Sequence, residues 1–147
     1  MFTFVALAEQ HWPLIPDEGR PVLTEATKGI VALDKDGDIA GACCFDSWAL
    51  NSCQIHIYIK NPFILKHGFA EEVFNYAFNV CGKGMVIGVT AADNVRALKF
   101  IKNIGLNEIF RIPDGYADGV AFVITQLKKE DCRWITHTDA SHAAGSN

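Results

Sequence analysis

A short segment that precedes an amphipathic stretch carries residue types able to hold an anion. Lys66 and His67 offer two cationic side chains immediately before Gly68, and Phe69 and Ala70 begin the amphipathic stretch. The first N–H groups of a helix have no partner within it and carry partial positive charge, so such an end can bind a phosphate. Gly68 and Ala70 are small enough to let a phosphate approach the backbone. A turn that binds nothing would use the same residues, so the pattern leaves a phosphate site and a plain turn both open.

The cysteines favour a structural role. Their number is odd, most of them lie inside apolar runs, and no pair has the C-x-x-C spacing of a zinc or redox site. Free cysteine commonly behaves as a small buried hydrophobe. We therefore expect unpaired, mostly buried thiols at Cys43, Cys44, Cys53, Cys81 and Cys132.

The acidic string at residues 34–38 resembles the beginning of a calcium loop. Such a loop, starting at Asp34, needs Gly at its sixth position and Glu at its twelfth. Those positions hold Ile39 and Phe45, whereas Asp36-Gly37 is a typical hairpin pair. We expect a hairpin turn here and no metal site.

Several well-known catalytic motifs are missing from the chain. It contains no G-x-x-x-x-G-K-[ST] loop, no G-x-G-x-x-G after a strand, no H-E-x-x-H and no G-x-S-x-G. Kinase, dinucleotide-dependent dehydrogenase, zinc protease and α/β-hydrolase chemistry therefore lose their main support.

The spacing of apolar residues distinguishes the strands from the helices that must position the candidate residues. From 53 to 60 isoleucines alternate with Gln54, His56 and Tyr58, as in a strand with two different faces. From 70 to 81 apolar residues recur every three or four positions, which predicts a helix ended by the glycines at 82–84. A second helix is expected from Asp93, a suitable N-cap, to a C-cap at Gly105.

Strands are expected on both sides of these helices. Runs of apolar and β-branched residues predict them at about 2–7, 30–33, 39–45, 85–90, 107–112 and 119–127. A connecting loop is expected at 113–119. This order indicates an α+β fold around a mixed sheet.

In this order the elements and two local motifs resemble the GNAT superfamily of acyl-CoA-dependent N-acyltransferases. Lys60-Asn61-Pro62, followed by Leu65 to Ala70, occupies the place of a strand that ends in Val-x-Pro and continues into Q/R-x-x-G-x-G/A. The family's second motif is Asn-x-x-Ala-x-x-aromatic-Tyr-x-x-x-Gly-Phe, matched by Asn94, Ala97, Phe100, Ile101, Gly105 and Leu106. The resemblance covers about residues 28–130, and in style it is similar to the small members found in phage genomes.

The resemblance implies a GNAT-like α+β fold, with a mixed, mostly antiparallel central sheet flanked by helices, and acetyl-CoA as co-substrate. The backbone of Tyr58, Ile59 and Lys60 would pair with the pantetheine arm. Asn94 would contact this arm and Phe100 would pack beside it. The pyrophosphate would be held by the segment Lys66, His67, Gly68, Phe69 and Ala70.

The resemblance also indicates candidates for proton transfer. Gln54 and His56 lie where several members place a base or a water-relaying group, and a histidine with its usual pKa of about 6.5 suits that task. Tyr58 and Tyr116 could each supply an acid.

Three residues depart from the family pattern. Leu65 replaces the Q/R of the phosphate loop, Ile101 replaces the Tyr that commonly protonates the departing thiolate, and Lys60 replaces an apolar residue. Leu65 and Ile101 support the alternative that the chain is a GNAT-fold module without catalytic activity.

The expected activity is transfer of acetyl to an amine of an unidentified acceptor by direct attack on the thioester. One alternative is a catalytically degenerate GNAT-fold module that binds or inhibits. Another is an unrelated α+β interaction domain.

Composition sets the remaining expectations. The 147 residues suit one domain at 1–135, followed by a small, polar tail at 136–147 that we expect to be disordered. Thirteen basic and 17 acidic residues give a net charge of −4, which argues against nucleic acid and for a small-molecule or protein amine as acceptor. No apolar run approaches the length of a membrane span and no signal peptide is recognisable, so we expect a soluble, cytoplasmic protein. The oligomeric state stays open, with a homodimer as one option.

Overall fold

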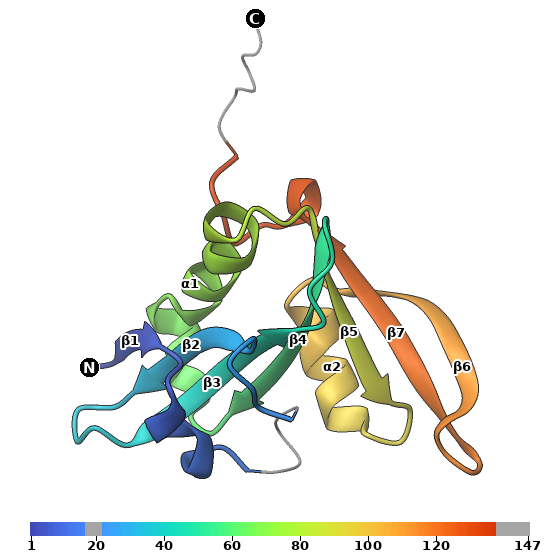
Figure 1. Ribbon diagram of the computed structural model, residues 1–147, viewed down its shortest axis with the longest axis horizontal. Helices are drawn as coiled ribbons and strands as arrows, with labels where there is room; N and C mark the ends of the chain where they lie inside the picture. The colour runs from blue at the N-terminus through green and yellow to red at the C-terminus, as the bar shows by residue number, and fades with distance from the viewer. Residues whose placement is uncertain (17–21, 138–147) are drawn as a thin grey trace, which may run out of the picture.

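The computed structural model describes residues 1–16 and 22–137 of the chain. Its strands are β1 (Thr3–Ala6), β2 (Lys28–Leu33), β3 (Ile39–Asp46), β4 (Ser52–Ile59), β5 (Met85–Ala91), β6 (Asn107–Ala117) and β7 (Val120–Lys128). They form one sheet in the order β1-β2-β3-β4-β5-β7-β6 (Figure 1). Every neighbouring pair is antiparallel except β4 and β5, which are parallel. The expected mixed, mostly antiparallel sheet is therefore confirmed.

The two α-helices cover one face of this sheet. They are α1 (Phe69–Asn75), which continues as a π-helical turn over Tyr76–Val80, and α2 (Val95–Asn103). Shorter 3-10 helices span Glu9–Leu14, Pro62–His67 and Lys129–Asp131. The helix predicted over 70–81 is confirmed, with its last turn wider than an α-helix.

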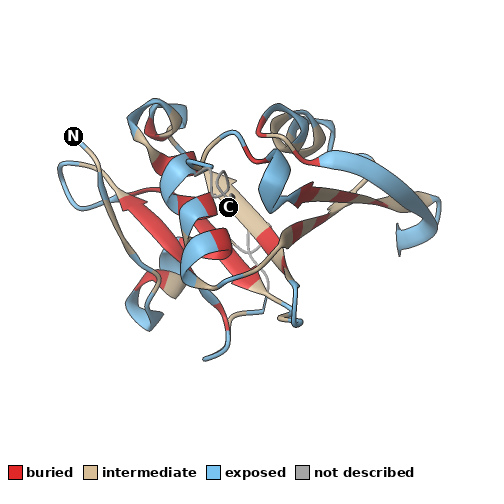
Figure 2. Ribbon diagram, turned by 90° about the horizontal axis from the view of Figure 1, so that it is seen from above, coloured by how far each residue is buried: buried red, intermediate tan, exposed pale blue. Residues whose placement is uncertain are grey.

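Two apolar clusters lie on opposite faces of the sheet. The larger cluster packs α1 against β2, β3 and β4, and includes Phe45, Phe69, Phe74 and Phe78. The smaller one lies beneath the N-terminal segment, around Ile15 and Val31. Figure 2 shows the buried residues gathered along α1 and the adjacent strands, whereas all of β6 is exposed.

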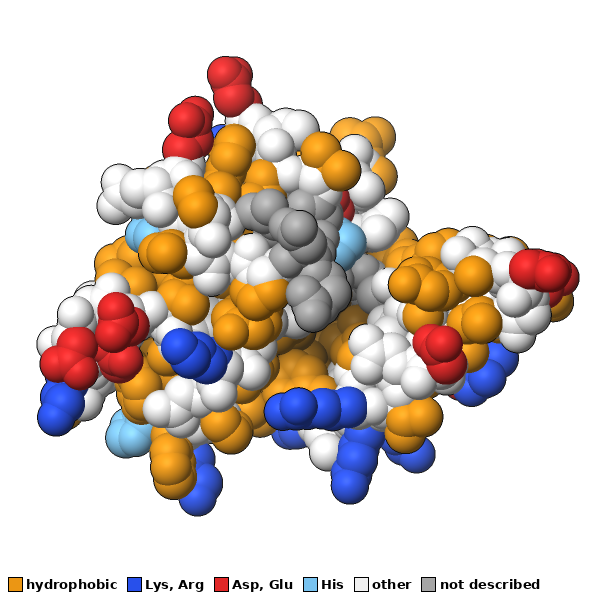
Figure 3. Space-filling model, turned by 90° about the horizontal axis from the view of Figure 1, so that it is seen from below, with side chains coloured by type: hydrophobic (Ala, Val, Ile, Leu, Met, Phe, Trp, Pro, Cys, Tyr) orange, Lys and Arg blue, Asp and Glu red, His pale blue; other side chains and the backbone are white. Residues whose placement is uncertain are grey.

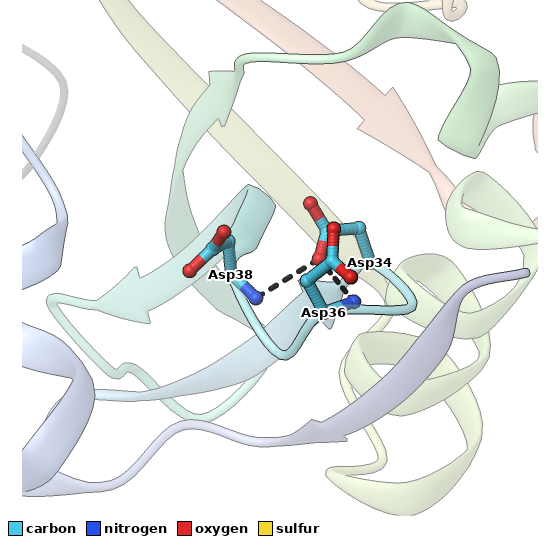
Figure 4. Close-up of side chains that lie close together, drawn as sticks. All are labelled: Asp34, Asp36 and Asp38. Atoms are coloured by element: carbon cyan, nitrogen blue, oxygen red, sulfur yellow. Dashed lines mark hydrogen bonds between the residues drawn. The ribbon is translucent and has the colours of Figure 1, made fainter.

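The turn between β2 and β3 has the predicted hairpin structure. The carboxylate of Asp34 accepts the N–H of Asp36 at 2.9 Å and that of Asp38 at 3.0 Å (Figure 4). Gly37 has a φ of +82°, in the left-handed region that glycine adopts without steric cost. The carboxylates of Asp34, Asp36 and Asp38 each have an oxygen within 4.8 Å of an oxygen of the other two. The Asp34 carboxylate is also the acceptor of the hydrogen bonds that hold the turn.

Three local expectations need correction. The N-cap of α2 is Asn94 rather than Asp93, since the Asn94 side chain accepts the Ala97 N–H at 3.2 Å. The C-cap is Ile104, and Gly105 follows it with a φ of +113°. The loop expected from 113 is instead part of β6, which shifts register between Ile112 and Ala117. An edge strand tolerates proline and such an irregularity, because no further strand needs its hydrogen bonds.

The cysteines are unpaired, as expected, and four of the five are buried. No helix in the described ranges is both long and apolar enough to cross a membrane. The part of the predicted tail from residue 138 onward lies outside the described residues.

Candidate active site

The candidate site begins where two parallel strands separate. β4 and β5 pair only between Ser52–Gln54 and Met85–Ile87. Beyond Gln54 the two strands diverge, and α2 lies beside the resulting opening (Figure 1). The second half of β4 therefore keeps β3 as a neighbour on one side and has no strand on the other.

The hydrogen-bond pattern of β4 shows which backbone groups face this opening. Lys60 donates its N–H to the carbonyl of Ala40 at 2.9 Å, toward β3. Backbone groups alternate in direction along a strand, so those of Tyr58 also face β3 whereas those of Ile57 and Ile59 face the opening. Contrary to expectation, the N–H of Lys60 is therefore not available to a ligand. By the same alternation, the backbone N–H and carbonyl of Tyr58 point toward β3 rather than toward the opening.

A cavity of about 410 Å³ occupies the opening. Ile55, Ile57 and Ile59 of β4 form one wall, and Ala97, Phe100 and Ile101 of α2 form the other. Figure 3 shows a hollow with hydrophobic side chains at its base and Lys or Arg side chains beside it. The cavity is thus an apolar cleft bordered on one side by free backbone groups.

Several residues singled out in the sequence line this cavity. Asn94 and Phe100, expected to contact the co-substrate, lie on its wall together with Tyr58. So do Leu65 and Ile101, the two apolar replacements of family residues. Two of the three departures from the family pattern therefore lie at the cavity, whereas the third, Lys60, does not line it.

The segment expected to be a phosphate-binding loop is more regular than predicted. Pro62–His67 forms a 3-10 helix whose first turn is capped by Asn61, which accepts the Phe63 N–H at 3.0 Å. Gly68, with a φ of +98°, donates its N–H to the carbonyl of Ile64. This N–H is consequently engaged within the protein. Proline at the first position of the segment favours such a helix start, a signal that the sequence offered.

The other residues of this segment differ in exposure. Lys66 and His67 are exposed, with the Lys66 Nζ 5.7 Å from the centroid of the Phe63 ring. Phe69 and Ala70 are buried in the first turn of α1, and only their backbone N–H groups could meet a ligand.

His56 lies on the opposite face of β4 from the isoleucines that line the cavity. Its Nε2 lies 2.8 Å from Oδ1 of Asp46, and both side chains are 24% exposed. Gln54, on the same face as His56, is directly opposite Asp46 in the ladder. The structure thus brings Gln54 and His56 together with an acidic residue that the sequence pattern did not reveal.

Tyr116 lies elsewhere. Its side chain is 59% exposed and its ring contacts Phe122 edge-on, with the centroids 5.8 Å apart. It is not among the residues that line the cavity. A role for Tyr116 as an acid therefore stays a prediction.

Comparisons with known proteins identify the fold. No protein-family model matches the chain, and no curated protein matches it in sequence. Among solved structures, a chimera of the Vibrio cholerae spermidine N-acetyltransferase SpeG with hSSAT matches with a TM-score of 0.69 at 13% identity, over 88% of this chain and 96% of that one. A protein from Desulfovibrio desulfuricans described as a GNAT-family acetyltransferase gives 0.69 at 14% identity, over 87% and 99%. One described as a phosphinothricin N-acetyltransferase gives 0.61 at 17%, over 87% and 98%.

These similarities show that the chain has the GNAT fold. The alternative of an unrelated α+β fold is therefore wrong. At such low identities the likeness concerns the fold alone, because one fold can carry different activities.

Proposed function

We propose that this GNAT-fold chain is an N-acetyltransferase that binds acetyl-CoA in the cavity between β4 and α2 and acetylates an amine. The observation that carries this proposal is the separation of β4 from β5, which leaves the backbone groups of Ile57 and Ile59 without a strand partner beside an apolar cleft. The spermidine and phosphinothricin N-acetyltransferases named above support an amine as the acceptor.

The residues of the cleft fit the chemistry of a pantetheine arm. The arm combines amide groups with short methylene chains, so its amides can pair with Ile57 and Ile59 as an added strand would. Its apolar parts would contact Ala97 and Phe100 on α2. Arg96 borders the same cavity and offers a cation to a phosphate.

The pyrophosphate has a less complete site. Lys66 and His67 are exposed and offer side-chain contacts. The first N–H groups of α1, at Phe69 and Ala70, would be further candidates for contact with an anion. The N–H of Gly68 is not, because Ile64 accepts it. We therefore expect phosphate contacts to come mainly from side chains.

The bound thioester would supply the acetyl group, and the chain's own residues would handle protons. An amine is protonated at neutral pH and must lose a proton before it attacks a carbonyl carbon. His56 is the proposed base, with Gln54 beside it as a group able to orient a water or the amine. Free backbone N–H groups of β4 would polarise the thioester carbonyl.

A module that binds acetyl-CoA without catalysis is the second candidate. Ile101 lies on the cavity wall where the resemblance expects a tyrosine to protonate the thiolate, and it has no proton to give. Loss of that acid slows departure of the thiolate rather than preventing it, so we place catalysis first.

The proposal is tested by following release of the CoA thiol from acetyl-CoA across a panel of amines that includes polyamines, amino acids and peptides with free N-termini. We expect amine-dependent release by the native protein. His56→Gln should lower kcat by about 100-fold or more, with affinity for acetyl-CoA changed by no more than about twofold. His137→Gln, which alters a histidine whose Nε2 contacts the backbone carbonyl of Cys132 rather than Asp46, is the matched control.

The possible outcomes of this experiment distinguish the two candidate functions and test the role of His56. Unchanged turnover in His56→Gln would remove His56 as the base. Binding of acetyl-CoA without thiol release for any amine would favour the binding module. Absence of binding would contradict both candidates.

A further inference from the structure

We propose that Asp46 is a positioning residue, whose carboxylate holds His56 in the tautomer with its proton on Nε2 and so leaves Nδ1 as the basic nitrogen. The catalytic consequence rests on the proposed function. The tautomer itself does not, and it can be measured without any activity.

The geometry of the contact sets the direction of the hydrogen bond. The Nε2–Oδ1 separation of 2.8 Å is within the range of a charge-assisted hydrogen bond. An ionised carboxylate has only acceptor oxygens, so the imidazole nitrogen must be the donor. A neutral imidazole that donates through Nε2 carries its lone pair on Nδ1.

The β-ladder explains why these two side chains meet. Cys44 is directly opposite His56, and Asp46 is directly opposite Gln54, so Asp46 and His56 are diagonal neighbours across β3 and β4. Diagonal neighbours on one face are within reach of long side chains. The two strands are paired continuously from Gly41–Ile59 to Asp46–Gln54, which fixes the separation of their backbones.

Burial gives the contact its strength. Both side chains are about three-quarters buried, so solvent screens their interaction less than it screens a surface pair. The other ion pair among the described residues, Arg111 with Glu108, has both side chains about half exposed. The Asp46–His56 pair is therefore better placed to hold one ring orientation.

The proposed step moves one proton and keeps the charges balanced. The ammonium of the acceptor loses a proton to Nδ1 of His56, so an N–H bond of the amine breaks and an Nδ1–H bond forms. The imidazolium then carries a proton on each nitrogen, and the Asp46 carboxylate accepts the Nε2–H and stabilises the positive charge.

The first test is ¹⁵N NMR of the full chain labelled at histidine, because the ring nitrogens shift strongly with protonation. We expect Nε2 of His56 to be protonated and Nδ1 unprotonated at a pH where the ring is neutral. In Asp46→Ala the two tautomers should become mixed. Asp36→Asn, which changes an exposed carboxylate in the 34–38 turn, should leave the signals as in the native protein. A native ring protonated on Nδ1, or an unaltered tautomer in Asp46→Ala, would overturn the proposal.

The second test is kinetic. We expect Asp46→Ala to lower kcat at least tenfold while KM for the amine and affinity for acetyl-CoA change by no more than about twofold. Asp46→Asn keeps the shape of the side chain and serves if Asp46→Ala does not fold. A fall in kcat without any change of tautomer would overturn the positioning role. A changed tautomer with native kcat would instead show that His56 is not the base, and thus that the proposed mechanism fails while the contact stands.

Discussion

The thiols of Cys43 and Cys53 are buried in the core, and the Tyr76 hydroxyl is partly buried beside it. Burial raises the pKa of Cys53 to about 12, and burial together with a hydrogen bond to Cys81 raises the pKa of Tyr76 to about 12. Burial also raises the pKa of the Cys43 thiol. A thiol that stays protonated at neutral pH is a poor nucleophile. The structural role expected for these cysteines therefore has a physical cause.

The raised pKa of Tyr76 predicts how stability changes in alkali. Its ordinary pKa is 10.0 in the unfolded chain and about 12 in the folded one, so the unfolded chain ionises first. The stabilisation is fully present below pH 10 and is lost as the pH rises through 12. We expect the Tm of Tyr76→Phe to fall a few degrees less than that of the native protein over this interval, as followed by circular dichroism. Tyr116→Phe, an exposed position, is the control. Equal slopes for native protein and Tyr76→Phe would contradict the assignment.

At the scale of elements, the site depends on α2 lying across the opening between β4 and β5. The inner face of α2 carries small and apolar residues that leave room for a ligand, whereas its outer face is polar. Ala97 is the smallest residue on the cavity wall of this helix. A larger side chain at this position would therefore reduce the space in the cleft.

Filling the cleft from α2 should weaken the binding of acetyl-CoA without unfolding the chain. In Ala97→Phe the new ring would occupy cavity space rather than a packed core, so we expect the dissociation constant for acetyl-CoA to rise at least tenfold. Isothermal titration calorimetry measures this constant. Lys99→Phe, on the exposed face of the same helix, should bind as the native chain does. Equal affinities for the two variants would move the binding site away from this cleft.

The sequence predicted the elements in which apolar residues recur at regular spacing, and it missed features that depend on tertiary structure. The alternation around His56 and the three-to-four-residue spacing from Ala70 predicted β4 and the helix after it, because a single period extends over each element. The motif singled out Asn94 and Phe100, which line the cavity, and their contact with a co-substrate stays a prediction. Asp46 was missed because its role follows from the register between β3 and β4, and β3 is almost uniformly apolar and shows no alternation. The 3-10 helix at 62–67 was missed because a segment so short has no period.

At the scale of the whole molecule, the chain keeps a complete GNAT sheet with very little sequence in common with its structural neighbours. Identities of 13–17% accompany TM-scores of 0.61–0.69. Cores tolerate extensive substitution when pattern and volume are kept, so a fold persists after most residues have changed. The net charge of −4 is compatible with a phosphate ligand, because such a ligand needs a few local contacts rather than a basic surface.

Thermal unfolding of the unmodified chain, with and without acetyl-CoA, shows whether the folded chain binds this co-substrate. A ligand that binds only the folded state stabilises it by about 2.7 kcal/mol at 100 times its dissociation constant. For a domain of this size we predict that Tm rises by about 5–10 °C. An unchanged Tm at millimolar acetyl-CoA would contradict the account.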